Sequence, residues 1–200
     1  MKIYHRSNLS EKKLNEISFF HLKNIKGEFN LFGVEFFKRF YKSISVHRDS
    51  KFITLEKKNK IEGFLIYTTS SMALSKIYLK NNVYFFFYFF IRSLTNIKLT
   101  TKFIKFLFFG YYLNHLKKKY NYPELISIAL NKKFRKKNYG KLLINELKKK
   151  LVIKKKNYCI VILRNSKKLK KFYMINSFSE TNLKVPFHNV KIFILKKILN

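Results

Sequence analysis

The first third of the chain has the hydrophobic spacing of a short strand, two amphipathic helices and two further strands. Strands are predicted over residues 2–5, 51–56 and 61–67, and a tight polar turn at residues 57–60 joins the last two. Apolar residues recur at helical intervals in two places: Leu14, Ile17 and Phe20 behind an N-cap at Ser10, and then Phe37, Phe40, Tyr41 and Ile44. Gly63 inside the last strand indicates a bulge or a close backbone approach.

The last third of the chain continues the alternation of strands and helices. A strand that begins at Glu124 leads into a basic turn, and the helix after the turn has one apolar face, formed by Leu142, Leu143, Leu147 and Leu151. A strand over residues 158–163, a helix from about 166 to 176 and two strands over 178–185 and 190–196 follow. The order of elements predicts a mixed α/β sheet domain with one parallel step across the helix after the basic turn.

Residues 68–121 interrupt this order and predict an inserted pair of helices. The segment contains an aromatic run at 84–90 and then apolar residues at helical intervals: Leu99, Phe103, Phe106, Phe109 and Leu113. Three interpretations stay open: a packed hydrophobic cap, a substrate lid, or a weak membrane-surface contact through residues 83–113. Packing or a lid is favoured, because short apolar helices usually belong to a core. The longest apolar run, 83–91, is about half of the ~20 residues that span a bilayer.

Composition suggests two classes of partner. The chain has 200 residues and a formal net charge of +34, which is typical of proteins that bind nucleic acid or an anionic membrane. However, lysines are spread over nearly every segment, and residues with A/T-rich codons are abundant together, so genome composition accounts for much of the charge. A nucleic-acid-binding protein would also use more arginine for bidentate contacts. A solvated lysine-rich surface is therefore the favoured interpretation.

The remaining chemistry-bearing residue types point to no metal or disulfide site. The single cysteine, Cys159, lies in the apolar run 158–163 and is expected to be a small buried side chain. No metal is expected, because the histidines are isolated from one another and lack ligand spacing: His5, His21, His47, His115 and His188. No secretory signal is visible, so a cytoplasmic, bacterial-style protein is expected.

The basic turn between the strand that ends in Ile128-Ala129-Leu130 and the following helix is the strongest functional signal. Such a turn aims backbone N–H groups at whatever lies over the helix N-terminus, and this place suits a phosphate. Neither G-x-x-x-x-G-K-[ST] nor G-x-G-x-x-G occurs in the chain. The turn instead matches [R/Q]-x-x-G-x-[G/A], with Arg135 and Gly140 at its two ends. Asn138 replaces the first glycine, and asparagine accepts a left-handed backbone more readily than other residues with side chains.

A second pattern follows at the expected distance along the chain. Residues 166–178 partly match N-x-x-A-x-x-F-Y-x-x-x-G-F, with Phe172, Tyr173 and Phe178 in register. The Asn, Ala and Gly positions hold Ser166, Leu169 and Ser177, although Asn165 is adjacent to the first of them. Taken with the basic turn and the order of elements, these residues resemble the GNAT N-acetyltransferase superfamily over all of the chain except the insertion.

The resemblance implies a fold, a co-substrate and site residues. It implies one N-acetyltransferase domain over residues 1–200, with a mostly antiparallel sheet of about six to seven strands, flanking helices, and the insertion between the third and fourth strands. Acetyl-coenzyme A would be the co-substrate, bound by Ile128, Ala129, Leu130, Arg135, Lys136, Lys137, Asn138, Tyr139, Gly140, Lys141, Asn165 and Phe172. Tyr173 would protonate the leaving thiolate, and Glu124 would accept the amine proton, often through water.

The acceptor amine stays open at this stage. An amino sugar of surface-polysaccharide synthesis is favoured, because the insertion resembles that of acetyltransferases encoded among such genes and a basic surface attracts nucleotide sugars. A protein N-terminus, a lysine or a polyamine-like amine are alternatives. A coenzyme-binding family member without turnover and a non-enzymatic basic protein that coats nucleic acid or a membrane surface are the competing classes.

Overall fold

The computed structural model describes residues 1–69, 83, 87, 90, 91, 100, 101, 104, 123–164, 166–184 and 190–196. Most of the predicted insertion therefore lies outside the described residues, and so does its proposed membrane-surface contact. The helices and strands are β1 (Lys2–Arg6), α1 (Glu11–Asn24), η1 (Glu28–Phe32), α2 (Gly33–Ser45), β2 (Ser50–Lys57), β3 (Lys60–Thr68), β4 (Glu124–Leu130), η2 (Lys132–Phe134), α6 (Tyr139–Ile153), β5 (Tyr158–Arg164), α7 (Lys167–Ile175), β6 (Phe178–Lys184) and β7 (Val190–Lys196).

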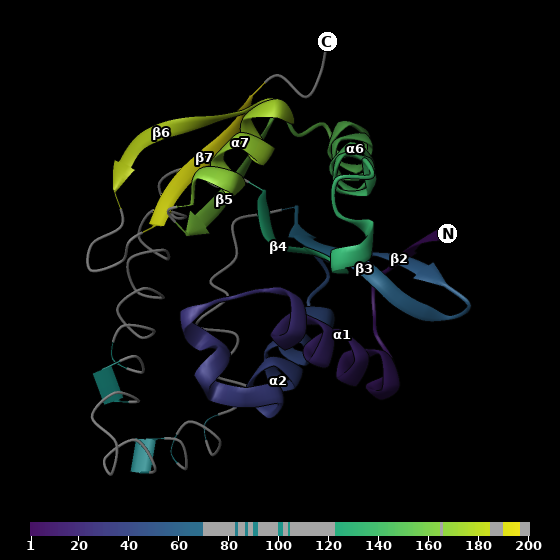
Figure 1. Cartoon of the computed structure of the whole chain (residues 1–200), viewed down its shortest axis with the longest axis vertical. Coiled ribbons are helices and arrows are strands. Elements are labelled where there is room, and N and C mark those ends of the chain that lie inside the picture. Colours follow the sequence, from purple (N-terminus) through teal and green to yellow (C-terminus); the bar gives the residue numbers. More distant parts are fainter. Residues whose placement is uncertain are drawn as a thin grey trace.

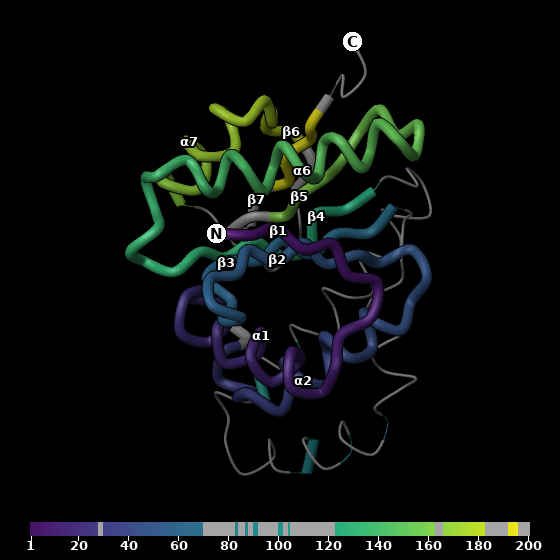
Figure 2. Tube along the Cα trace, turned by 90° about the vertical axis from the view of Figure 1, so that its right-hand side faces the viewer, coloured from purple at the N-terminus to yellow at the C-terminus, as the bar shows by residue number. Residues whose placement is uncertain are grey.

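A single seven-stranded sheet forms the centre of the described structure. The strand order is β1-β2-β3-β4-β5-β7-β6, and every neighbouring pair is antiparallel except β4 and β5. Helices α1 and α2 cover one face of the sheet, and α6 and α7 cover the other (Figures 1 and 2). This arrangement confirms the predicted mixed α/β fold, including its one parallel step across the helix that follows the basic turn.

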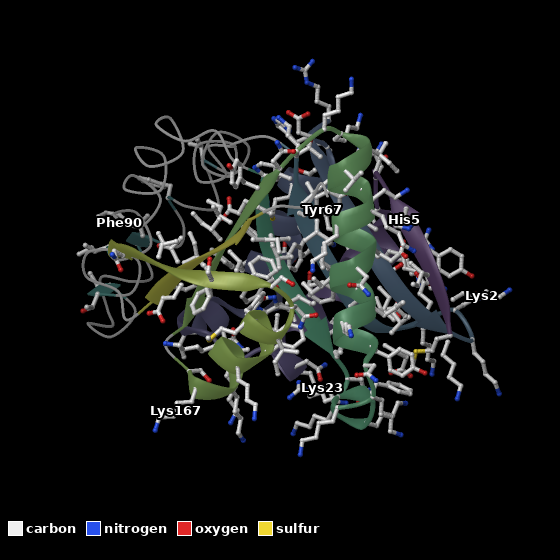
Figure 3. The ribbon with its side chains drawn as sticks, turned by 90° about the horizontal axis from the view of Figure 1, so that it is seen from above. Lys2, His5, Lys23, Tyr67, Phe90 and Lys167 are labelled. Carbon is white, nitrogen blue, oxygen red and sulfur yellow. The ribbon has the colours of Figure 1, made fainter. Side chains whose placement is uncertain are left out.

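Strand alternation builds a separate core on each face of the sheet. On β3, Phe64 and Ile66 pack with α1 and α2, whereas Leu65 and Tyr67 pack with α6 and α7, because successive side chains of a strand point to opposite faces. Figure 3 shows Tyr67 beneath α6. The buried face of α6 consists of Gly140, Leu143, Ile144, Leu147 and Leu151.

Local chemistry explains how the first elements are held together. The β2–β3 hairpin turns at Lys58 and Asn59, which both have positive φ, 49° and 61°, as a two-residue hairpin turn of the I′ type requires. Lys13 of α1 donates to Glu16, to Glu56 of β2 and to the Asn59 carbonyl oxygen, at 2.9, 3.1 and 2.9 Å. One lysine thus connects the first helix to the strand and turn below it.

Two predictions of detail were wrong. Thr68, expected to lie outside the strand pattern, pairs with Glu124 as the last residue of β3. Leu142 is 36% exposed and does not belong to the buried face of α6. Ile144 takes its place, because it lies one turn after Gly140 and one turn before Leu147 on the face that meets the sheet.

Ser177 generates a stability prediction, because it has φ 73° between α7 and β6. A side chain in this left-handed region costs roughly 1–2 kcal/mol, a cost that glycine does not bear. Ser177→Gly should therefore raise the free energy of unfolding by about 1 kcal/mol, which urea denaturation would measure. The matched control is Ser179→Gly within β6, which should destabilise, because glycine weakens a strand interior. Destabilisation by Ser177→Gly would contradict the strain argument.

Candidate functional site

The central feature of the site is that β4 and β5 are paired only at their start. Their partners are Glu124 with Ile160 and Leu125 with Val161. Farther along, β4 stays paired with β3 as far as Leu130, and β5 stays paired with β7 as far as Arg164. The facing edges of residues 126–130 and 162–164 therefore diverge, and we call this place the β4–β5 opening. Backbone N–H and C=O groups along such an edge are available to a ligand.

A β-bulge in β4 lies at the closed end of this opening. Ile66 of β3 pairs with Ser127, and the next residue of β3 pairs with Leu125, so Ile126 is the extra residue. Leu125 packs with α6, and Ile126 packs with α1 and α2. Because of the bulge, Ser127, which pairs with Ile66 of β3, also lies on the α1–α2 side. Two consecutive residues of β4 thus face the α1–α2 side.

The basic loop (residues 131–138) joins β4 to α6 and contains two left-handed residues, Lys136 with φ 63° and Asn138 with φ 60° and ψ 0°. Asn138 thus has the backbone conformation that the glycine of the pattern would adopt. Its side chain makes no capping hydrogen bond to the start of α6. The first N–H groups of the helix are consequently not occupied by this cap and can serve an anion.

Two side chains fix the path of the basic loop. The Arg135 guanidinium donates to the Leu130 carbonyl oxygen at 3.1 Å and to the Asn24 carbonyl oxygen at 2.9 Å, which ties the loop to the end of α1. The Glu62 carboxylate accepts from Asn131 Nδ2 at 2.8 Å and from Lys133 Nζ at 3.0 Å. Arg135, expected on the co-substrate, is therefore engaged with the protein in this structure. Figure 3 shows Lys23, at the end of α1, beside the loop.

The two sequence patterns meet in space. A Cβ atom on Gly140 would lie 2.9 Å from Phe172 Cε2, a separation that real contacts do not allow. A side chain at the start of α6 would therefore displace the Phe172 ring of α7. Phe172 packs edge-on against Tyr173, with ring centroids 5.1 Å apart, and Tyr173 packs in the same way against Phe178 at 5.2 Å.

Tyr173 lies in the core on the α6–α7 face and is 3% exposed. Burial raises the pKa of its hydroxyl, and the neighbouring Cys159 thiol raises it further. Cys159 is fully buried, which confirms that it is a core side chain, and burial raises the pKa of its thiol. Tyr173 therefore keeps its proton at neutral pH, as a proton donor must.

Glu124 lies at the closed end of the β4–β5 opening, where it pairs with both neighbouring strands. It is 5% exposed. Strand alternation places its side chain opposite to that of Leu125, on the α1–α2 side. Glu124 and Tyr173 thus lie on opposite faces of the sheet.

The structure brings most of the expected residues to one region. Ile128, Ala129 and Leu130 form the end of β4, where it is paired with β3 but not with β5, and the basic loop and the start of α6 continue from it. Asn165 lies outside the described residues. Sequence reasoning missed Glu62 and Asn24, which hold the loop. Glu62 offered a usable signal, because it is an acidic residue in an otherwise apolar strand next to Gly63.

The close backbone approach expected at Gly63 is confirmed, because the end of β4 lies directly against this residue of β3. A Cβ atom there would lie 2.5 Å from Leu130 Cδ2 and 3.1 Å from the Ala129 carbonyl oxygen. The bulge prediction also holds, because the β2–β3 register shifts next to this residue. Glycine at this position lets β3 approach the end of β4, from which the basic loop starts.

Among the described residues, no group of three or more His, Cys, Asp or Glu side chains could hold a metal ion. Within the same residues, no helix is long and apolar enough to cross a membrane.

No protein-family model and no curated protein matches the chain. Solved structures match it along nearly its full length. PaiA N-acetyltransferase from Thermoplasma acidophilum, in complex with coenzyme A, is 15% identical with a TM-score of 0.59, covering 98% of this chain and 99% of its own. A putative GNAT-family acetyltransferase from Desulfovibrio desulfuricans is 11% identical with a TM-score of 0.62, and the match covers 98% of this chain and 99% of that one. Drosophila melanogaster polyamine N-acetyltransferase is 10% identical with a TM-score of 0.62, and the match covers 98% of this chain and 100% of that one. The chain thus has the fold of the GNAT N-acetyltransferases.

Proposed function

We propose that the protein is an N-acetyltransferase that moves an acetyl group from acetyl-coenzyme A directly to a primary amine. The observation that carries the proposal is the β4–β5 opening, with the uncapped start of α6 at its end. Acetyl-coenzyme A bound along β4 would have its phosphates at the N-terminus of α6 and its acetyl thioester between the edges of β4 and β5. We take residues 1–200 as one catalytic domain, in a cytoplasmic protein.

The residues around the opening fit acetyl-coenzyme A in charge and shape. The pyrophosphate would lie against the N–H groups of Tyr139, Gly140 and Lys141, where the helix dipole and the exposed Lys136 and Lys137 favour an anion. The pantetheine arm would follow the free edge of β4 from Leu130 to Ile128. Arg135 and Phe172 would act mainly by holding the loop and the start of α6 in place.

The chemistry divides between the two faces of the sheet. Backbone N–H groups near Ile128 would stabilise the oxyanion that forms when the amine attacks the thioester, an effect worth a few kcal/mol. Tyr173, protonated and on the α6–α7 side, would give its proton to the departing thiolate. Glu124, on the α1–α2 side, would accept the proton that the amine loses, directly or through water. Acid and base therefore do not compete for one position.

Charge favours an anionic acceptor over a cationic one. At a formal charge of +34 the protein attracts nucleotide-linked amino sugars and repels polyamines. We therefore propose an amino sugar of surface-polysaccharide synthesis as the acceptor, and a protein N-terminus or lysine as the alternative. Drosophila polyamine N-acetyltransferase has the same fold, so fold alone does not select the amine.

The first test is a thermal shift followed by an acceptor screen. Acetyl-coenzyme A at ~100 times its Kd should stabilise the protein by about 2.7 kcal/mol, at low and at moderate salt alike. A stabilisation that inorganic pyrophosphate reproduces and that salt abolishes would indicate a non-enzymatic polyanion-binding protein instead. Release of free coenzyme A thiol with nucleotide amino sugars, N-terminal peptides and polyamines then identifies the acceptor. Binding without release for every amine would contradict catalysis.

Removal of the Tyr173 hydroxyl tests the acid. Tyr173→Phe keeps the ring between Phe172 and Phe178, so the fold and the affinity for acetyl-coenzyme A should be preserved. The turnover number should fall by roughly 10²-fold or more, because the thiolate then leaves without its proton donor. Tyr158→Phe, on an exposed tyrosine of β5, is the matched control and should leave the rate unchanged. Near-normal turnover of Tyr173→Phe would remove this role.

Substitutions at Asn138 test the basic loop. Asn138→Gly should bind acetyl-coenzyme A as tightly as the parent protein, because glycine adopts φ 60° without strain. Asn138→Val should bind it more weakly, by about tenfold for ~1.4 kcal/mol of strain, because a β-branched residue resists positive φ. Isothermal titration would measure both values. Asn138→Gly also removes the polar side chain, so the comparison of the two variants separates the backbone effect from that loss. Equal affinities for Asn138→Gly and Asn138→Val would contradict the argument.

A further inference from the structure

The Arg135 guanidinium joins two elements that lie far apart in the sequence. Its Nε donates to the Leu130 carbonyl oxygen at 3.1 Å, and its Nη2 donates to the Asn24 carbonyl oxygen at 2.9 Å. Leu130 is the last residue of β4, and Asn24 is the last residue of α1. One side chain of the basic loop thus connects the strand along which the pantetheine arm would lie with the end of the first helix.

The contact with Asn24 caps the C-terminal end of α1. The last four carbonyl groups of a helix have no partner within the helix, and the helix dipole makes this end partly negative. Basic side chains near the end of a helix can satisfy such carbonyl groups. Here the arginine comes from a position 111 residues away in the sequence. The stability of the last turn of α1 therefore depends on where the basic loop lies.

The segment that follows this cap is folded back towards the same helix end. Asn30 Nδ2 donates to the Ile25 carbonyl oxygen at 2.7 Å, and the Asn30 N–H donates to the Gly27 carbonyl oxygen at 3.3 Å. Phe32 then enters the core on the α1–α2 face, to which Ala129 of β4 also belongs. We call residues 25–32 the α1–α2 connection. It begins directly after the residue that Arg135 caps.

The basic loop is fixed at its beginning and meets the proposed pyrophosphate site at its end. The Glu62 carboxylate accepts from Asn131 Nδ2 at 2.8 Å, at the beginning of the loop. Lys136 and Asn138 follow Arg135 closely and have positive φ, 63° and 60°, before α6 begins. An anion bound to the first N–H groups of α6 would fix the loop at this second end and so restrict Arg135 between two fixed points.

We propose that Arg135 couples the coenzyme site to the last turn of α1 and to the α1–α2 connection. Bound coenzyme holds the guanidinium on the Asn24 carbonyl oxygen, and the helix end then opens less often. Arg135 is a positioning residue, because it acts through Asn24 and not on the reacting atoms. The coupling rests on the proposed function and extends it to the α1–α2 layer, on whose side Glu124 would accept the amine proton.

The coupling acts in both directions. The factor by which coenzyme A slows the opening of residues 24–30 equals the factor by which loss of the Arg135 contact weakens coenzyme A binding. A side chain that only stabilised the end of the helix would change its opening without changing the affinity for coenzyme A.

The experiment is amide hydrogen exchange of the full chain with and without saturating coenzyme A, together with isothermal titration of coenzyme A. In the parent protein, coenzyme A should slow exchange of residues 24–30 about fivefold, the lower end of typical couplings between sites. These amides include the Ile25 N–H, which donates to the His21 carbonyl oxygen at 2.8 Å in the last turn of α1.

Two variants separate the contact from the charge of the loop. Arg135→Lys keeps the positive charge, but its single ammonium group cannot reproduce the two-ended contact of a guanidinium. This variant should bind coenzyme A about fivefold more weakly, and coenzyme A should no longer slow exchange of residues 24–30. Lys132→Gln removes a positive charge from an exposed position of the same loop and leaves Arg135 in place, so coenzyme A should still slow exchange in this control.

Each other outcome overturns a defined part of the proposal. The coupling is wrong if coenzyme A binds the parent protein without slowing exchange of residues 24–30, or if Arg135→Lys keeps both the parent affinity and the slowing. Faster exchange with coenzyme A would show that the ligand withdraws Arg135 from Asn24, which also contradicts the coupling. These results leave the proposed acetyl transfer intact. A folded parent protein that binds no coenzyme A would overturn both.

Discussion

The separation of β4 from β5 after two residue pairs is the constraint on which the rest of the site depends. Each strand keeps its other neighbour, so the sheet opens without losing its core. The bulge at Ile126 supports the separation, because a bulge increases local twist and bends the strand that contains it. Glu124 lies at the closed end of this opening on the α1–α2 side, and Tyr173 is buried on the other face of the sheet.

The basic loop is held by contacts far apart in sequence, not by its own composition. Glu62 of β3 and Asn24 of α1 fix two of its cations, and Phe172 of α7 limits how α6 can begin. A ligand that orders the loop therefore also acts on the end of α1, through the contact between Arg135 and Asn24.

Sequence patterns predicted the elements that depend on short-range chemistry. Helical spacing, Ser10 as an N-cap and the parallel step after the basic turn are local signals, and the left-handed backbone at Asn138 follows from the motif. Three features were not predictable in this way: the β4 bulge at Ile126, the hydrogen bonds of Arg135 to the protein, and the exposure of Leu142. Each depends on which residue of a distant element happens to lie opposite, and periodicity along one segment contains no such information.

Asn138, Ser177 and Leu169 differ from the residues of the two sequence patterns, and each keeps the local structure with a different amount of strain. Asn138 and Ser177 replace glycines, and both adopt the positive φ that glycine would supply, 60° and 73°. Asparagine accepts this conformation more easily than serine, so the larger strain lies at Ser177, away from the basic loop. Leu169 replaces an alanine but is 40% exposed, so its extra volume enters solvent and not the contact between α6 and α7. The substitutions at these three positions are therefore expected to lower the stability of the fold more than they disturb the basic loop.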